Sequence, residues 1–141
     1  MTWGVLVLGV FLVAFLRTPG AFLLPSLEAE DGTFVFPYFY ANRGVAELLH
    51  FHAGYVPLGL NIIAWLSVRL PTTLIPYGFA WLPLTVTLVA STWLYGARFR
   101  PWLGPDVTRA VLCILLVLAP IAQYHIYANA TYSIWGALLL F

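Results

Sequence analysis

The stretch LPTTLIPYGFAWLPLTVTLVASTWLYGA at residues 70–97 decides the fold, because no charged side chain occurs in it. A helix over residues 75–96 is long enough to cross the roughly 30 Å hydrocarbon core of a bilayer. The composition agrees, since 62% of the 141 residues are hydrophobic and 8% are charged, whereas soluble domains carry about 25% charged residues. The sequence therefore predicts an integral membrane protein.

Apolar segments on both sides of this helix predict further crossings. Residues 110–141 carry no charge, which indicates a helix at 107–124, a short external loop at 125–132 and the start of another helix at 133–141. Residues 1–24 are expected to form the first membrane helix, although their uncharged part, residues 2–16, is only about 22 Å long as a helix. A signal peptide is the rival interpretation, but no Lys or Arg precedes the apolar run.

The positions of the arginines predict which loops of the chain face the cytoplasm. Half of the six arginines lie in ARFRPWLGPDVTR at residues 97–109, so the loop at 97–106 is expected in the cytoplasm. Residues 56–68 form only about 20 Å of helix, too short for a comfortable crossing, and are expected to lie along the membrane surface. The expected fold class is therefore all-α: one polytopic transmembrane domain in which residues 25–74 form a long external loop with juxtamembrane helices.

Two other classes of protein or site are excluded. The arginines are too dispersed to form a basic patch for nucleic acid. The single cysteine, Cys113, lies in an apolar run and has no partner for an internal disulfide.

Polar chemistry is concentrated in residues 25–55, which hold four of the five acidic residues and two of the three histidines. Charge in so apolar a chain is either solvated at the membrane surface or held at a functional site. The aromatic run FVFPYFY at 34–40 is typical of an interfacial belt, although tyrosine rings also stack on sugars.

In their order and spacing, these features resemble the C-type glycosyltransferase superfamily (GT-C), membrane enzymes that use polyprenyl-phosphate-linked sugars as donors. The resemblance is to the amino-terminal part of such enzymes and implies that the chain is a fragment of a longer one. It rests on Glu-Asp-Gly at 30–32, Gly-Tyr at 54–55 before an apolar helix, the basic loop at 98–100 and a second external loop at 120–135. Many relatives carry an acidic residue in that second loop, whereas this chain has none there.

The resemblance implies sugar transfer at the external face of a plasma (inner) membrane. Asp31 would be the general base that takes the acceptor proton, with Glu30 as an alternative base or as its partner in orienting Mg²⁺ or Mn²⁺. The chemistry also requires donors for the leaving phosphate. The substrate-binding candidates that we consider are Arg43, His50, His52, Tyr55, His125 and Asn129.

Two expectations about particular residues and one alternative function remain open. Gly32 is expected to let the backbone turn, which would keep Asp31 out of a helix. His50 and His52 could share a metal ion only on an extended backbone, because a helix points residues two apart to different sides. The alternative function is a non-catalytic membrane scaffold or assembly subunit whose external loop docks a partner.

Overall fold

The computed structural model describes residues 2–17, 19–27, 31–52 and 54–118. Within these ranges the regular elements are helices, and the one β-type pairing is an isolated bridge between His52 and Tyr55. The expected all-α class is confirmed.

Helix α5, Ile75–Trp93, is the helix on which α1 (Trp3–Arg17), α2 (Pro19–Leu23), α4 (Leu58–Ser67) and α7 (Asp106–Leu118) pack. With the preceding turn it forms the 22-residue helix Thr72–Trp93, which in the described part of the chain is the one unbroken helix long and apolar enough to cross a membrane. The hydroxyls of Thr85 and Ser91 donate to carbonyls four residues earlier, at 2.9 and 2.7 Å. Such bonds satisfy the polar groups of a helix that lies in an apolar environment.

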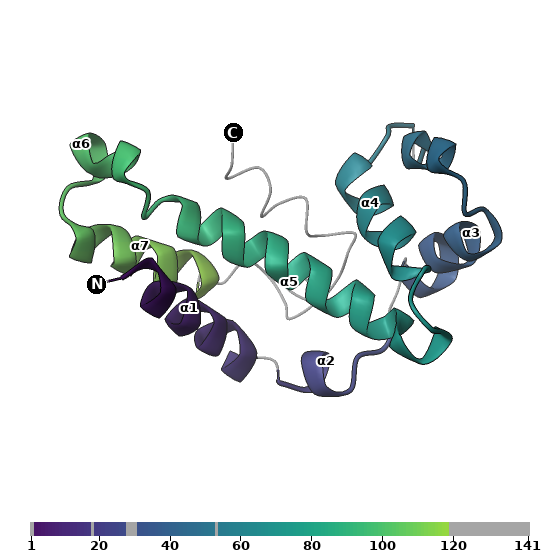
Figure 1. Cartoon of the computed structure of the whole chain (residues 1–141), viewed down its shortest axis with the longest axis horizontal. Coiled ribbons are helices and arrows are strands. Elements are labelled where there is room, and N and C mark those ends of the chain that lie inside the picture. Colours follow the sequence, from purple (N-terminus) through teal and green to yellow (C-terminus); the bar gives the residue numbers. More distant parts are fainter. Residues whose placement is uncertain (1, 18, 28–30, 53, 119–141) are drawn as a thin grey trace.

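Two shorter apolar helices, α1 (Trp3–Arg17) and α7 (Asp106–Leu118), pack beside α5 (Figure 1). Their shared core contains Leu6, Val10, Ala14, Phe22, Ala80, Leu84, Tyr95, Ala110, Cys113 and Val117. Arg17 donates to the carbonyl of Val117 at 2.8 Å, which ties the end of α1 to the end of α7.

Within residues 1–24, where a single helix is expected, the structure describes α1 and α2, Pro19–Leu23. The expected helix at 107–124 is described as far as Leu118. The loop expected at 125–132 and the helix expected at 133–141 lie outside the described residues.

Residues 31–52 and 54–70 form a set of short helices and turns that we call the loop unit. It contains a π-helical turn (Asp31–Val35), α3 (Phe36–Ala41), a 3₁₀ helix (Val45–Leu49) and α4 (Leu58–Ser67). Helix α4 has 10 residues and is therefore about 15 Å long, too short to cross a bilayer. The loop unit packs on the start of α5 through a second core, which contains Val35, Phe39, Leu60, Ile63, Ala64, Val68, Ile75 and Phe79.

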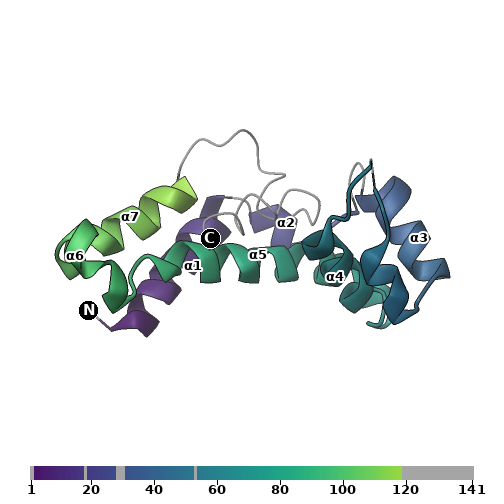
Figure 2. The ribbon, with the colours of Figure 1, turned by 90° about the horizontal axis from the view of Figure 1, so that it is seen from above.

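Residues 97–106, which we call the arginine-rich loop, and the loop unit lie at opposite ends of α5 (Figures 1 and 2). At the far end from the loop unit, α6 (Arg100–Leu103) leads into α7 through a bend of 95°. Gly104 adopts φ 80° there, a left-handed conformation that glycine reaches without strain. Arg109, in the first turn of α7, donates to the carbonyls of Tyr95 and Gly96, which follow α5.

Candidate functional site

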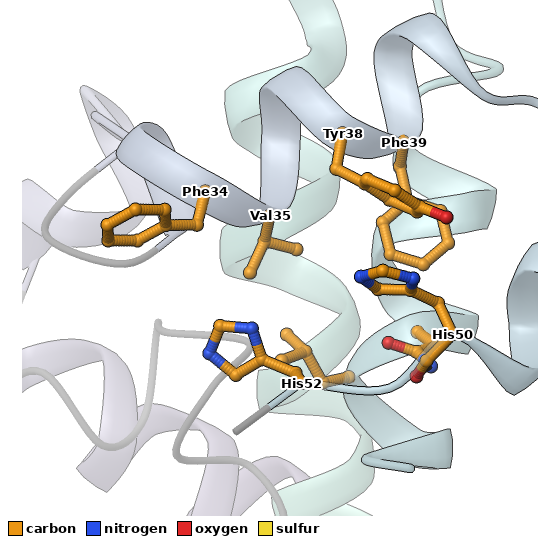
Figure 3. Close-up of a pocket in the computed structure, with 8 residues that line it drawn as sticks. Phe34, Val35, Tyr38, Phe39, His50 and His52 are labelled. Atoms are coloured by element: carbon orange, nitrogen blue, oxygen red, sulfur yellow. Dashed lines mark hydrogen bonds between the residues drawn. The ribbon is translucent and has the colours of Figure 1, made fainter. Parts of the chain in front are cut away.

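A cavity of about 200 Å³ opens in the loop unit (Figure 3). One wall is the helical segment 31–41, a second is the stretch 50–52 and the third is α4. The cavity is lined by Phe34, Val35, Tyr38, Phe39, His50, His52, Leu60 and Asn61. We call it the histidine pocket.

His52 is held by a tight turn. Its backbone N–H donates to the carbonyl of Tyr55 at 2.8 Å, and the N–H of Tyr55 donates back to the carbonyl of His52 at 3.2 Å. Gly54 adopts φ 87° inside this turn, a conformation that a side chain would strain. The turn keeps the backbone at His52 extended, and its imidazole lines the pocket.

His50 is held by two other elements. Its N–H donates to the carbonyl of Glu47 at 2.9 Å. Its carbonyl accepts a 3.0 Å hydrogen bond from the side-chain amide of Asn61, which also donates to the carbonyl of Leu48 at 3.0 Å. The backbone of His50 is extended, with φ −60° and ψ 133°. The geometric condition for a shared role of the two histidines, an extended backbone, is therefore met.

Tyr38 organises the side of the pocket next to His50. The rings of Tyr38 and His50 stack with centroids 3.7 Å apart and planes 23° apart. The Tyr38 hydroxyl donates to a carboxylate oxygen of Glu47. That hydrogen bond, with burial and the negative charge of Glu47 as further causes, raises the pKa of Tyr38 above its ordinary value. One aromatic ring thus connects a carboxylate and an imidazole.

Asp31 is the first residue of the π-helical turn and only 3% exposed. The expectation that Gly32 turns the chain and keeps Asp31 out of a helix is wrong, because Gly32 lies within the same turn. Gly32 is needed for close approach instead, since a Cβ there would lie 2.7 Å from the carbonyl oxygen of Leu27. Asp31 does not line the histidine pocket, but it begins the helical segment whose next turns do.

The other predicted site residues are dispersed or undescribed. Arg43 does not line the pocket, and its guanidinium lies over the exposed ring of Tyr40, 4.7 Å from the centroid. Tyr55 is 54% exposed and contributes its backbone to the turn. Glu30, His125 and Asn129 lie outside the described residues.

Sequence reasoning missed two polar residues of the pocket. Tyr38 was assigned to the interfacial belt with its neighbours. Asn61 was not singled out, although it is the one amide in the apolar run VPLGLNIIAWL at 56–66. A single amide at a 1% exposed helical position is the signal that could have identified it, because buried amides are kept where they hydrogen-bond.

An open apolar groove of about 530 Å³ lies where α4 meets α5. It is lined by Leu66, Leu70, Leu74, Tyr77, Gly78, Trp81 and Leu82. Arg69, between two of these leucines in the chain, has its guanidinium 3.2 Å from the centroid of the Trp65 ring and donates to the carbonyl of Arg43 at 2.7 Å. The Arg69 guanidinium is thus directed to Trp65 and Arg43, neither of which lines the groove.

No group of three or more His, Cys, Asp or Glu that could hold a metal ion occurs among the residues that the structure describes. Of the two carboxylates expected to bind Mg²⁺ or Mn²⁺, only Asp31 falls within those residues. Comparisons with known protein families, curated protein sequences and solved structures find no match to the chain.

Proposed function

We propose that the chain forms part of a GT-C-like membrane glycosyltransferase, which transfers a sugar from a polyprenyl-phosphate donor to an acceptor hydroxyl at the external face. The observation that carries the proposal is the position of Asp31. A carboxylate that is 3% exposed begins the helical segment lining a pocket with two imidazoles. Buried carboxylates are costly and concentrate at functional sites.

We propose that the protein is polytopic, with α1 and α7 crossing the membrane beside α5. In this arrangement Arg98 and Arg100 face the cytoplasm, and the loop unit lies at the external surface. The packing of α1, α5 and α7 into one bundle supports the proposal, as does the separation of the loop unit from the arginine-rich loop along α5. Helix α4 then lies along the surface rather than across the bilayer.

The proposed reaction divides the work between a base and phosphate donors. Asp31 accepts the proton of the acceptor hydroxyl as that oxygen attacks the anomeric carbon. The bond between the anomeric carbon and the phosphate oxygen breaks, and the imidazoles of His50 and His52 donate hydrogen bonds to the leaving phosphate. Mg²⁺ or Mn²⁺ on Asp31 and Glu30 would supply positive charge to that phosphate when bound, with water and phosphate oxygens completing its ligand set.

The apolar groove fits the lipid part of the donor. A polyprenyl chain would bury its apolar surface against the leucines that line the groove. Arg43 stays the phosphate-binding arginine of this proposal, since the Arg69 guanidinium lies over the Trp65 ring and donates to the carbonyls of Trp65 and Arg43.

The test is transfer from radiolabelled polyprenyl-phosphate sugars by membranes that contain the full chain. Asp31→Asn keeps the size of the side chain and removes the proton acceptor, so turnover should fall by about 10² to 10⁴ while donor binding changes little. Glu30→Gln is the matched carboxylate control and should lose less. Near-normal transfer by both inserted variants would leave the proposed reaction without its base.

That outcome would favour the scaffold alternative. Exposed apolar side chains on the loop unit provide a surface for it, since Val45, Leu49 and Phe51 are 66%, 66% and 67% exposed. In a scaffold these residues would contact a partner protein, and replacing the carboxylates of Asp31 and Glu30 would not impair function.

A further inference from the structure

The arginine-rich loop exposes an aromatic ring and two cations at one end of a membrane-length helix. Its helix α6 lies at the end of α5 that is far from the loop unit (Figures 1 and 2). Trp102 on α6 is 82% exposed, more than any other aromatic side chain in the described part of the chain. Arg98 and Arg100, shortly before it in the chain, are exposed as well. Such a segment suits a partner that combines apolar and anionic groups.

The charges of Arg98 and Arg100 are not balanced within the described part of the chain. Asp106 is the one acidic residue between 97 and 109, and its carboxylate pairs with the guanidinium of Arg109. Neither Arg98 nor Arg100 makes a side-chain hydrogen bond or an ion pair with any residue that the structure describes. Both are therefore uncompensated cations, and an anionic partner would complement them.

The guanidinium of Arg98 is held in place while its hydrogen-bond donors stay available. It lies 4.3 Å from the centroid of the Trp93 ring and 4.6 Å from that of Phe99. A cation–π contact attracts the charge but satisfies no N–H group, so the donors of Arg98 can bind phosphate oxygens. Arg69 is the contrast, because its guanidinium also lies over a tryptophan ring but donates to two backbone carbonyls.

The headgroup layer of a membrane combines the two properties that this segment suits. Tryptophan rings are enriched in that layer, and arginines beside a membrane helix are attracted to anionic lipids. A nucleic acid is a poorer fit, since its affinity grows with the number of phosphates neutralised and only Arg98 and Arg100 are uncompensated here. A lipid surface also contacts the whole segment 97–102, so the side chains need not converge on a single atom.

We propose that Arg98, Arg100 and Trp102 bind anionic phospholipid headgroups in the leaflet at this end of α5. The guanidinium groups donate hydrogen bonds to lipid phosphates, and the Trp102 ring lies between the headgroups and the acyl chains. This contact fixes the depth of α5 in the bilayer. The inference goes beyond the proposed sugar transfer and requires only that α5 lies in a membrane.

The test uses the full chain in phosphatidylcholine vesicles, with a fluorophore attached to Val107→Cys in a Cys113→Ala background. Val107 is 73% exposed in the first turn of α7. Nitroxide-labelled phosphatidylglycerol should quench the fluorophore more than the same fraction of nitroxide-labelled phosphatidylcholine, because the anionic lipid gathers at the arginines. This preference should fall by about 5-fold in Arg98→Gln and in Arg100→Gln, the effect of one arginine near an anionic membrane surface.

Arg69→Gln is the matched control, since it removes the same charge at the other end of α5 and should keep the preference. Trp102→Ala should weaken quenching by both lipids in equal proportion, because the indole contributes apolar contact and no charge. Equal quenching by the two lipids in the parent, an unchanged preference in Arg98→Gln and Arg100→Gln, an equal loss in Arg69→Gln, or displacement of the labelled phosphatidylglycerol by inorganic phosphate would each overturn the proposal. The readout involves no sugar donor or acceptor, so it can fail while the proposed sugar transfer holds.

Discussion

Gly78 is the point where α4 and α5 approach most closely among the described glycines, and its replacement by alanine should separate them. A Cβ at this position would lie 2.6 Å from the Ser67 Oγ and 2.9 Å from the Ser67 Cβ. Ser67 is fully buried, and its hydroxyl donates to the carbonyl of Ile63 at 2.7 Å. The serine therefore cannot move aside without losing that hydrogen bond.

Two effects of opposite sign decide how far Gly78→Ala changes the free energy of unfolding. Overpacking a well-packed site costs about 1 to 3 kcal/mol. Alanine is a better helix former than glycine by about 1 kcal/mol, which offsets part of that cost. Gly78→Ala should therefore lower the free energy of unfolding by up to about 2 kcal/mol.

The assay is unfolding in detergent with rising SDS, and the control is Gly9→Ala in α1, where nothing lies within 4 Å of the added Cβ. Gly9→Ala should be neutral or stabilising. Ser67→Gly removes both clashing serine atoms, so the double variant with Gly78→Ala should recover stability relative to the sum of the single variants. If Gly78→Ala stabilises the protein as much as Gly9→Ala does, the proposed close contact is refuted.

Two further predictions concern charge and hydrogen bonding. Arg109→Met removes the donor to the carbonyls of Tyr95 and Gly96, just beyond α5, and should cost about 1 to 3 kcal/mol for each hydrogen bond lost in the same unfolding assay. Asp106→Asn should cost less, because Asp106 is 53% exposed. Equal losses would contradict this role of Arg109. The pKa of Tyr38 is raised in the folded protein, so protonated Tyr38 stabilises the fold. This contribution to the free energy of unfolding is complete below about pH 10. It is lost as the pH rises through the raised pKa. Tyr38→Phe should remove that pH dependence, and unfolding curves of both proteins with the same alkaline dependence would show that the Tyr38–Glu47 bond is not its source.

The parts of the fold that depend on local composition could be predicted from the sequence. The uncharged run at 70–97 predicted a helix at 75–96, and the structure has Thr72–Trp93. The length of residues 56–68 predicted a helix too short to cross, and α4 is that helix. Hydrophobicity and length belong to the segment itself, so they can be read without knowledge of its neighbours.

The parts that depend on contacts between distant residues could not be predicted. The extended backbone of the two histidines depends on Asn61, 11 residues beyond His50, and on the turn at Gly54. The helical position of Gly32 depends on the close approach of Leu27. Arg109 counts toward the cytoplasmic charge bias in the sequence, yet it is 3% exposed and donates to the carbonyl of Gly96 just beyond α5. Tertiary contacts override local preference at each of these positions.

The proposed arrangement puts the loop unit and the arginine-rich loop on opposite faces of a membrane. It is tested most directly by single cysteines at Ala46 in the loop unit and at Trp102, which is 82% exposed in α6, each in a Cys113→Ala background. A membrane-impermeant thiol reagent added to intact cells should label Ala46→Cys at once and Trp102→Cys only after the membrane is opened. Labelling of both cysteines from the same face would contradict the claim and with it the external position of Asp31.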